Sequence, residues 1–117
     1  MTTQEVADLF YELAQEGKFD QIQDELYAED VKSIEPANSN WQNVEGLDKV
    51  KEKARQWQEM TEEMHGGYTN EPQVAGNFFA CVMGMDVTLK GQGRIKMDEI
   101  AVYEARDGKI VMEQFFF

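Results

Sequence analysis

The sequence has few of the residues that build disulfides, metal centres or basic surfaces. It contains one cysteine, Cys81, and one histidine, His65, among 117 residues. A single cysteine cannot form a disulfide within the chain, and no His/Cys cluster has zinc-ligand spacing, so we expect no metal. Basic residues are also scarce: 11 Lys and Arg stand against 23 Asp and Glu, which gives a net charge of −12. Such a surface repels phosphate backbones and anionic lipids, so we expect neither nucleic acid nor membrane as a partner.

The start of the chain also has no secretory signal pattern. Its first ten residues, MTTQEVADLF, have neither a basic beginning nor an apolar centre, so we expect a cytoplasmic protein. The length fits one domain over residues 1–117. A composition of 42% hydrophobic and 29% charged residues is typical of a globular protein.

The first half of the chain predicts three helices and a short strand. Thr2 and Glu5 form a capping-box pattern for a helix that ends at Gly17. The expected elements after it are a short helix over residues 19–26, a strand over 31–36, a loop over 37–46 that carries Trp41, and a helix from Leu47 to Met64 ended by Gly66-Gly67. We expect the charged residues of the last helix to form a solvated stripe; they are Lys49, Glu52, Lys53 and Glu59.

The second half of the chain changes to strand periodicity. Three long strands are expected, over about 73–89, 92–105 and 109–117, with a short one over 67–71; Asp107-Gly108 is a strong hairpin signal. Helices followed by strands predict an α+β fold, with the helices on one face of a curved antiparallel sheet. Both sheet faces are apolar, so we expect the uncovered convex face to pack against a second copy, as a homodimer.

Three segments carry a resemblance to a known superfamily: LYAEDVKSIEP (26–36), EGLDKVKEKARQWQ (45–58) and DEIAVYEARDGKIVMEQFFF (98–117). Together they resemble the nuclear transport factor 2-like superfamily, in particular its SnoaL-like polyketide cyclase and ketosteroid isomerase branches. The resemblance implies a cystatin-like cone, in which a strongly curved sheet wraps around a long helix and a pocket opens between them. It also implies a dimer, and it leaves function open because this fold hosts enzymes, binders and assembly modules.

Glu35 is the first candidate for chemistry. Alternation along the strand puts Val31, Ser33 and Glu35 on one face, and the resemblance places Glu35, directly before Pro36, where the isomerase branch keeps its proton-shuttling base. A carboxylate that an apolar cone desolvates can exchange a proton near neutral pH. The other interpretation puts Glu35 in water at the rim of the cone.

Glu99 is the second candidate. The resemblance, with one residue of slack in the turn, places it where the isomerase branch keeps a protonated acid that donates to the substrate oxyanion. The other interpretation pairs Glu99 with Arg94, Lys96 or a dimer partner. The branch's second oxyanion donor, a tyrosine of the first helix, is replaced here by Phe10, which argues against steroid isomerisation.

His65 is the third candidate, as a proton carrier in the pocket or as a cap of the long helix. We expect ligand contacts from aromatic and methionine side chains, some of which would only fill the core. These residues are Tyr11, Trp57, Met60, Met64, Tyr68, Phe79, Met83, Met97, Tyr103 and Phe115.

The sequence favours a pocket protein for a small apolar molecule. In its catalytic form it would be a cofactor-free isomerase, cyclase or lyase in which Glu35 removes a proton and Glu99 holds the oxyanion, with His65 or Tyr103. The alternatives are a ligand-binding protein without chemistry and a dimerisation module whose cone is filled by its own side chains.

Overall fold

The computed structural model describes residues 1–117 and contains three helices and a seven-stranded sheet. The helices are α1 (Thr3–Gln15), α2 (Phe19–Leu26) and α3 (Leu47–Met60). The strands are β1 (Tyr27–Ile34), β2 (Val44–Glu45), β3 (Thr61–Thr69), β4 (Gln73–Ala75), β5 (Phe78–Leu89), β6 (Gly93–Arg106) and β7 (Lys109–Phe116). The expected α+β class is therefore confirmed. None of the three helices has the length and hydrophobicity that a membrane span requires.

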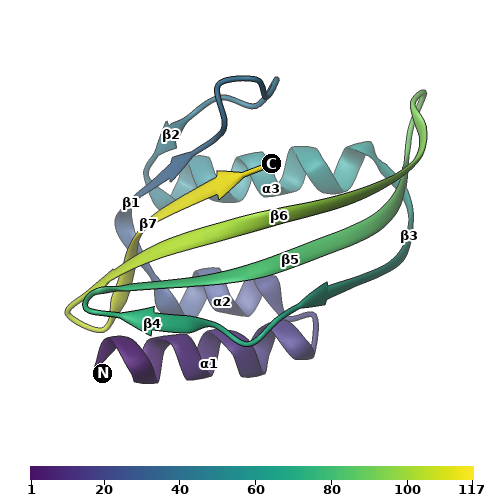
Figure 1. The fold of residues 1–117 in the computed structure, drawn as a ribbon. Coiled ribbons are helices and arrows are strands. Elements are labelled where there is room, and N and C mark those ends of the chain that lie inside the picture. The colour runs from purple at the N-terminus through teal and green to yellow at the C-terminus, as the bar shows by residue number, and fades with distance from the viewer.

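The sheet has the strand order β2-β1-β7-β6-β5-β3, with β4 also paired to β5. Figure 1 shows the long strands β5 and β6 sweeping across the molecule. All neighbours are antiparallel except β1 and β7, which run parallel. The prediction of a purely antiparallel sheet was wrong at this pair. The reason is that the first and last strands of the chain meet in the middle of the sheet, a pairing that no local turn signal reports.

The first helix forms as the sequence predicts. Thr2 Oγ1 accepts from the Glu5 backbone N–H at 3.1 Å, and Glu5 Oε1 accepts from the Thr2 N–H at 3.0 Å, which completes the capping box. At the other end Gly17 adopts φ 70°, which allows the Lys18 N–H to reach the Leu13 carbonyl at 2.9 Å. This left-handed geometry ends α1 where glycine is least strained.

The third helix is shorter than predicted. It ends at Met60, and the segment expected to continue it forms β3 instead. From Thr61, which opposes Leu89, to Thr69, which opposes Met83, the backbone pairs with β5. As a strand, the nine residues of β3 form backbone hydrogen bonds with β5, whereas as a helix only the four residues after Met60 would form them, with their own neighbours. The tertiary partner β5 therefore overrides the helical spacing of the apolar residues. The strand expected over 73–89 is likewise divided into β4 and β5, by a turn in which Gly76 has φ 59°.

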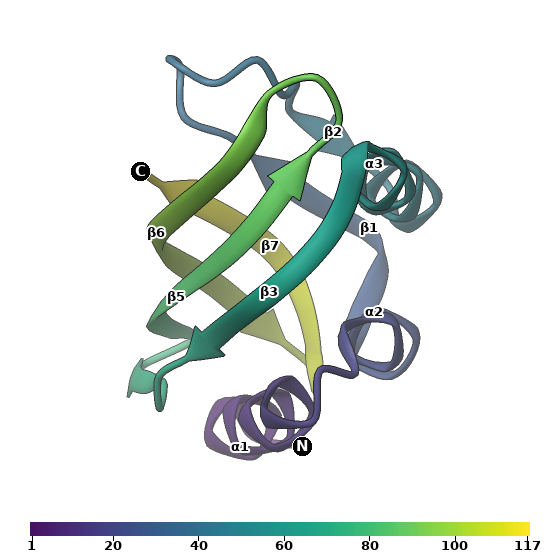
Figure 2. The same cartoon turned by 90° about the vertical axis from the view of Figure 1, so that its right-hand side faces the viewer.

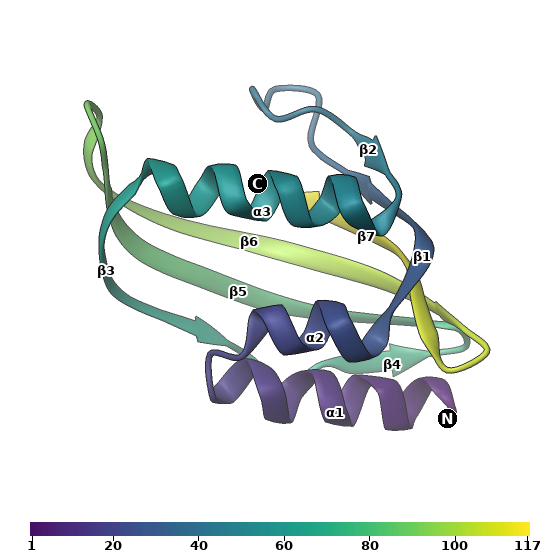
Figure 3. The ribbon, with the colours of Figure 1, turned by 180° about the vertical axis from the view of Figure 1, so that it is seen from behind.

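The sheet bends so that all three helices cover its concave face. Figure 3 shows α1, α2 and α3 in front of one face of the sheet, and Figure 2 shows α3 lying between β1 and β3. Register shifts interrupt the pairings of β1 with β7, β3 with β5 and β6 with β7, and such bulges sharpen the local twist. At the α1 side Phe10, Phe79 and Tyr103 pack together, with Phe10 4.7 Å from Tyr103 and 5.4 Å from Phe79 between ring centroids.

Candidate functional site

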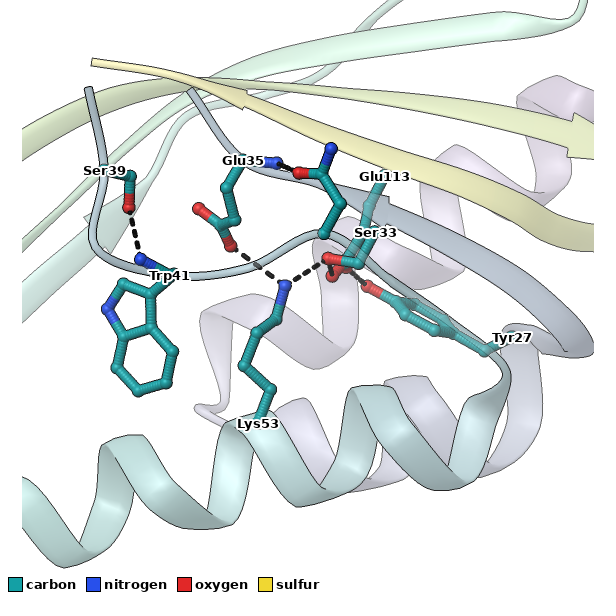
Figure 4. Close-up of polar contacts among 8 residues, drawn as sticks. Tyr27, Ser33, Glu35, Ser39, Trp41, Lys53 and Glu113 are labelled. Carbon is teal, nitrogen blue, oxygen red and sulfur yellow. Dashed lines mark hydrogen bonds and ion pairs between the residues drawn. The ribbon is translucent and has the colours of Figure 1, made fainter. Parts of the chain in front are cut away.

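An ion pair lies between the end of β1 and the middle of α3. Lys53 Nζ is 2.9 Å from Glu35 Oε1, and the two side chains are only 13% and 9% exposed. Figure 4 shows Lys53 rising from α3 toward Glu35. The backbone N–H of Glu35 donates to Asn43 Oδ1 at 2.7 Å, which ties the residue to the far side of the 35–43 loop. Glu35 therefore points into the protein, next to a cation, and not into water.

The ion pair continues inward as a chain of hydrogen bonds. Lys53 Nζ also donates to Ser33 Oγ at 2.6 Å, and the Ser33 hydroxyl donates to Glu113 Oε2 at 2.6 Å. The hydroxyl of Tyr27 donates to the other oxygen, Glu113 Oε1. Ser33, Tyr27 and Glu113 are buried, and no buried side-chain N or O atom in the protein lacks a partner. We call these five residues, Tyr27, Ser33, Glu35, Lys53 and Glu113, the polar cluster (Figure 4).

Strand register explains how the polar cluster assembles. Ser33 on β1 opposes Glu113 on β7, and Glu113 opposes Tyr103 on β6, so the three side chains share the concave face. Tyr27 lies at the start of β1, on the far side of a register shift. The β1–β7 pair is the parallel one, so the cluster depends on the contact that the sequence did not predict.

Burial and hydrogen bonds act against each other on Glu113. Burial raises the pKa of this carboxyl, while the hydrogen bonds from Ser33 and Tyr27 and the charge of Lys53 lower it; the net direction is upward. Both carboxyl oxygens accept from hydroxyl groups, an arrangement that suits an ionised carboxylate because it is an acceptor only. Burial also raises the pKa of Tyr27 and of Tyr103 well above the ordinary value, with Glu113 contributing to both, so both phenols stay neutral donors.

Glu99 lies on the same concave face, on β6. It opposes Met83 on β5, two residues along from the pair of Ala101 and Cys81. Burial, then the charges of Glu35 and Glu113, raise the pKa of Glu99 to about 7. Its expected alternative partner Arg94 instead binds Asp86, at 2.8 and 2.9 Å. Glu99 therefore lies on the face of the polar cluster as a carboxyl group that is about half protonated near neutral pH and mostly protonated below it.

The concave face and α3 also carry apolar side chains that are partly exposed. On the sheet these are Met83, Met85, Met97 and Phe115, and on α3 they are Trp57 and Met60; all are partly exposed. Strand register places the four sheet residues on the concave face. Trp41 from the 35–43 loop lies 6.1 Å from Trp57 between ring centroids. We call this set, with Trp41, the apolar mouth.

Three of the expected ligand contacts lie deeper or farther along the fold. Phe79 and Tyr103 are 1% and 3% exposed and pack against Phe10 in the core. Tyr11 is partly exposed on α1. Because Phe10 fills the core position of this helix turn, the tyrosine next to it takes another direction around the helix.

His65 and Tyr68 lie away from this site, on strand β3, which begins at Thr61 where the sequence predicted the last turn of the long helix. His65 Nε2 lies 2.7 Å from Thr88 Oγ1, and Nδ1 lies 3.1 Å from Glu63. Tyr68 opposes Gly84 on the convex face, and its hydroxyl donates to Asp98 at 2.5 Å. Met64 is 56% exposed. Strand β3 therefore directs His65 and Tyr68 away from the concave pocket, whereas Met64 opposes Val87, a buried residue of the concave face.

Sequence reasoning missed Lys53, Ser33 and Glu113 as functional residues. Lys53 was expected in a solvated stripe, although it lies three residues after Val50 and four before Trp57, which is the inward side of α3. The alternation of the last strand likewise puts Glu113 on the face of Phe115. Both signals were present, but Lys53 was interpreted as a surface residue and Glu113 was not singled out.

Two surface hollows lie away from these residues. One, of about 280 Å³, lies between α2 and α3 beside Asp24 and Lys51. The other, of about 490 Å³, lies where the N-terminus meets the β6–β7 hairpin. Both have mainly polar linings, unlike the pockets that hold apolar ligands.

Comparison with known proteins places the chain in a family. The model of the SnoaL-like domain matches residues 1–117. A crystal structure from Mesorhizobium loti, described as a SnoaL-like polyketide cyclase and, in brackets, as a carbohydrate phosphatase, is 35% identical over 100% of both chains, with a TM-score of 0.93. A cystatin-like protein from Xanthomonas campestris is 19% identical over 99% of this chain and 90% of its own, with a TM-score of 0.81.

Two further comparisons bear on the fold and on identity. TerC, crystallised with polyporic acid, is 18% identical over 98% of this chain and 90% of its own, with a TM-score of 0.75, a likeness of fold alone. None of the curated proteins matches the sequence. The full-length family match and the 35% identity over both whole chains agree with the cone-shaped α+β architecture. The chain belongs to the SnoaL-like domain family.

Proposed function

We propose that this protein binds a small apolar carbonyl compound on its concave face and moves a proton on it, as a cofactor-free isomerase, cyclase or lyase. The observation that carries the proposal is a pair of carboxyl groups in different states on one face. Glu35 is ion-paired and 9% exposed, and Glu99 has its pKa raised to about 7. Two carboxyl groups whose environments push their protonation apart are the usual basis of acid–base catalysis.

The proposed chemistry uses each carboxyl group once. Glu35 accepts a proton from the carbon next to the substrate carbonyl, and the electron pair of the broken C–H bond moves to the carbonyl oxygen as an enolate. Neutral Glu99 donates a hydrogen bond to that oxygen, where the negative charge develops. If the substrate carries a carbon–carbon double bond beside that carbon, Glu35 then returns the proton to the far end of the dienolate, which completes an isomerisation. If the substrate carries a second carbonyl, the enolate carbon attacks it, and Glu35 returns the proton to the alkoxide oxygen that the ring closure forms.

The apolar mouth supplies binding and desolvation. Methionine side chains adapt to irregular apolar ligands, and the rings of Trp41 and Trp57 offer flat surfaces at the entrance. We do not propose steroid isomerisation, because Phe10 stands where the isomerase branch has its tyrosine. His65 has no part in the proposal, since its hydrogen-bond partner Thr88 and ion-pair partner Glu63 lie outside the site.

Relatives support a small organic ligand. The Mesorhizobium loti relative is described as a polyketide cyclase, and TerC was crystallised with polyporic acid. Those descriptions concern those proteins, and they support here only the class of a small carbon compound.

One observation favours a second candidate, ligand binding without chemistry. Lys53 Nζ already binds Glu35 Oε1 at 2.9 Å, which occupies one of the two carboxylate oxygens that a catalytic base would use. In this alternative the carboxyl groups only orient the ligand.

Isotope exchange separates the two candidates. The purified protein is incubated in D₂O with small carbonyl probes (acetylacetone, cyclohexanone and 1-tetralone), and NMR follows deuterium at the carbon next to the carbonyl. We expect wild type to accelerate exchange of at least one probe, and Glu35→Gln to lose that acceleration. The matched control, Glu29→Gln, changes an exposed carboxylate of the same strand. If a probe raises the melting temperature but exchanges no faster with wild type than with Glu35→Gln, the protein is a binder.

We also propose that the chain forms a cytoplasmic homodimer through the convex face of the sheet. Val82, Ile100 and Phe116 lie directly opposite one another on three neighbouring strands and are 40%, 49% and 48% exposed. Phe78, on the same face of β5, is 45% exposed. A continuous apolar stripe of this kind supports a protein interface more than a solvated surface.

A further inference from the structure

The polar cluster has an order that the proposed acid–base reaction does not by itself require. Apart from the contact of Lys53 with Glu35, the hydrogen bonds within it run toward Glu113: Lys53 donates to Ser33, Ser33 donates to Glu113, and Tyr27 donates to Glu113 from the other side. Because a serine hydroxyl has one proton and Ser33 donates it to Glu113, Ser33 can meet the Lys53 ammonium only as an acceptor. The cluster thus connects two carboxyl groups, Glu35 at the start of the 35–43 loop and the buried Glu113. Lys53 is the single cation between them.

The charges explain why such an arrangement is stable. Lys53 is the only cation of the polar cluster, and it lies against Glu35 directly and against Glu113 through one hydroxyl. A buried carboxylate is costly unless a cation and hydrogen bonds compensate it. Glu113 is 5% exposed and Ser33 is fully buried, so both lie where the backbone of two paired strands fixes them. Glu35 follows the end of β1 and begins the 35–43 loop.

From this geometry we infer that Ser33 and Glu113 are positioning residues, which anchor the Lys53 ammonium and through it hold Glu35 pointing into the apolar mouth. The inference rests on the proposed function for its catalytic meaning, since Glu35 is the base in that proposal. The anchoring itself is a property of the protein without substrate. The lysine side chain has many rotamers, and the Ser33 hydroxyl, fixed by its bond to Glu113, favours the rotamer that reaches it.

Other titratable groups on the packed elements do not replace this anchor. Glu99 on β6 and Cys81 on β5 face the same side of the sheet, and burial raises the pKa of the Cys81 thiol to about 11, which keeps it neutral. Tyr103 opposes Glu113 and is neutral. Among the charged groups that shift the pKa of Glu113, Lys53 is the only cation.

The test measures how well each lysine amine is protected. The folded protein is treated with acetic anhydride at neutral pH, and mass spectrometry gives an acetylation rate for every lysine. In wild type we expect Lys53 to react much more slowly than Lys49, an exposed lysine of the same helix. Lys49 serves as the internal control in every variant.

Two variants separate an inner anchor from the ion pair with Glu35. In Ser33→Ala we expect acetylation of Lys53 to become about tenfold faster or more, because a hydrogen bond to a charged group is lost. In Glu35→Gln we expect Lys53 to stay protected within about twofold, because the amide oxygen of Gln still accepts a hydrogen bond and Ser33 still holds the ammonium. Unchanged protection in Ser33→Ala, or protection lost in Glu35→Gln, would overturn the inference.

A third variant and a second readout keep the test decisive. If Ser33→Ala fails to fold, Glu113→Gln serves instead, because it preserves an acceptor for Ser33 but removes the charge. Lys53 protection should then fall. The ¹³C NMR titration midpoint of Glu99 should also move down, because Glu113 is one cause of the raised pKa of Glu99. If Lys53 protection and the Glu99 titration midpoint both stay unchanged, the inference is contradicted. In the isotope-exchange assay Ser33→Ala should lose acceleration of any active probe while its melting temperature shows it folded. Labelling that follows these expectations without any exchange activity would leave the anchor standing and reject only the proposed reaction.

Discussion

Replacing Glu99 by glutamine should change how the stability of the protein depends on pH. The pKa of Glu99 is raised in the folded protein from 4.5 to about 7, first by burial and then by Glu35 and Glu113. A carboxyl group whose folded pKa is raised contributes stability that is fully present below the unfolded pKa and is lost as pH rises through the folded pKa. For Glu99 this loss falls between about pH 4.5 and pH 7.

The size of the loss follows from the same two values. The difference of about 2.5 pH units between 4.5 and about 7 corresponds to about 3 kcal/mol of unfolding free energy, at about 1.4 kcal/mol per unit. About 2.5 kcal/mol of it falls between pH 5 and pH 8, because the unfolded carboxyl is already partly ionised at pH 5. Glu99→Gln keeps the shape of a neutral carboxyl group but cannot ionise.

Urea denaturation of wild type and Glu99→Gln, at pH 5, 6, 7 and 8, measures this effect. Between pH 5 and pH 8 we expect the unfolding free energy of the variant to rise by about 2.5 kcal/mol relative to that of wild type. The control variant Glu29→Gln changes an exposed carboxylate, and its stability difference from wild type should not change with pH. A wild-type-minus-Glu99→Gln difference that stays flat from pH 5 to pH 8 would show that Glu99 is solvated, and the neutral-acid role proposed for it would be lost as well.

Three other outcomes are expected. Phe10→Ala should lower the unfolding free energy by about 3–5 kcal/mol in urea denaturation, because a ring 1% exposed leaves a cavity beside Phe79 and Tyr103; a loss below about 1 kcal/mol would mean the core collapses around it. Gly108→Ala should lower the unfolding free energy by about 1–2 kcal/mol, because Gly108 has φ 78° in the β6–β7 hairpin. The control Gly66→Ala, at a glycine with open space and no positive φ, should lower it less. Light scattering at micromolar concentration should report a dimer for wild type and a monomer for Ile100→Glu; a monomeric wild type would remove the proposed interface.

The sequence predicted those parts of the molecule that depend on neighbours along the chain. The capping box of Thr2 and Glu5, the stop at Gly17 and the hairpin at Asp107-Gly108 are all present. Each is a contact between residues at most a few positions apart, so the local pattern contains the partner as well as the signal. The class of fold and the family resemblance followed from the order of such elements.

Errors arose where a distant strand decided the outcome. The helical spacing after Met60 was real, but β5 offered backbone partners to residues 61–69 and drew them into the sheet. That pairing removed His65 and Tyr68 from the concave face, because a strand sends alternate side chains to opposite sides. Helical spacing reports one possible face of a segment, and it does not report whether a strand partner competes for the segment's backbone.

By itself, the sequence determined that Glu35 and Glu99 could share an inward face, because alternation along a strand fixes the side of each residue. The tertiary structure alone brought Lys53 from α3, Ser33 from β1 and Glu113 from β7 to one place. Those residues are up to 80 positions apart, and their meeting depends on the parallel pairing of the first and last strands. The role of a charged side chain at an inward position can be assigned only when its partner is known. The partner of each charge here comes from another element of the fold.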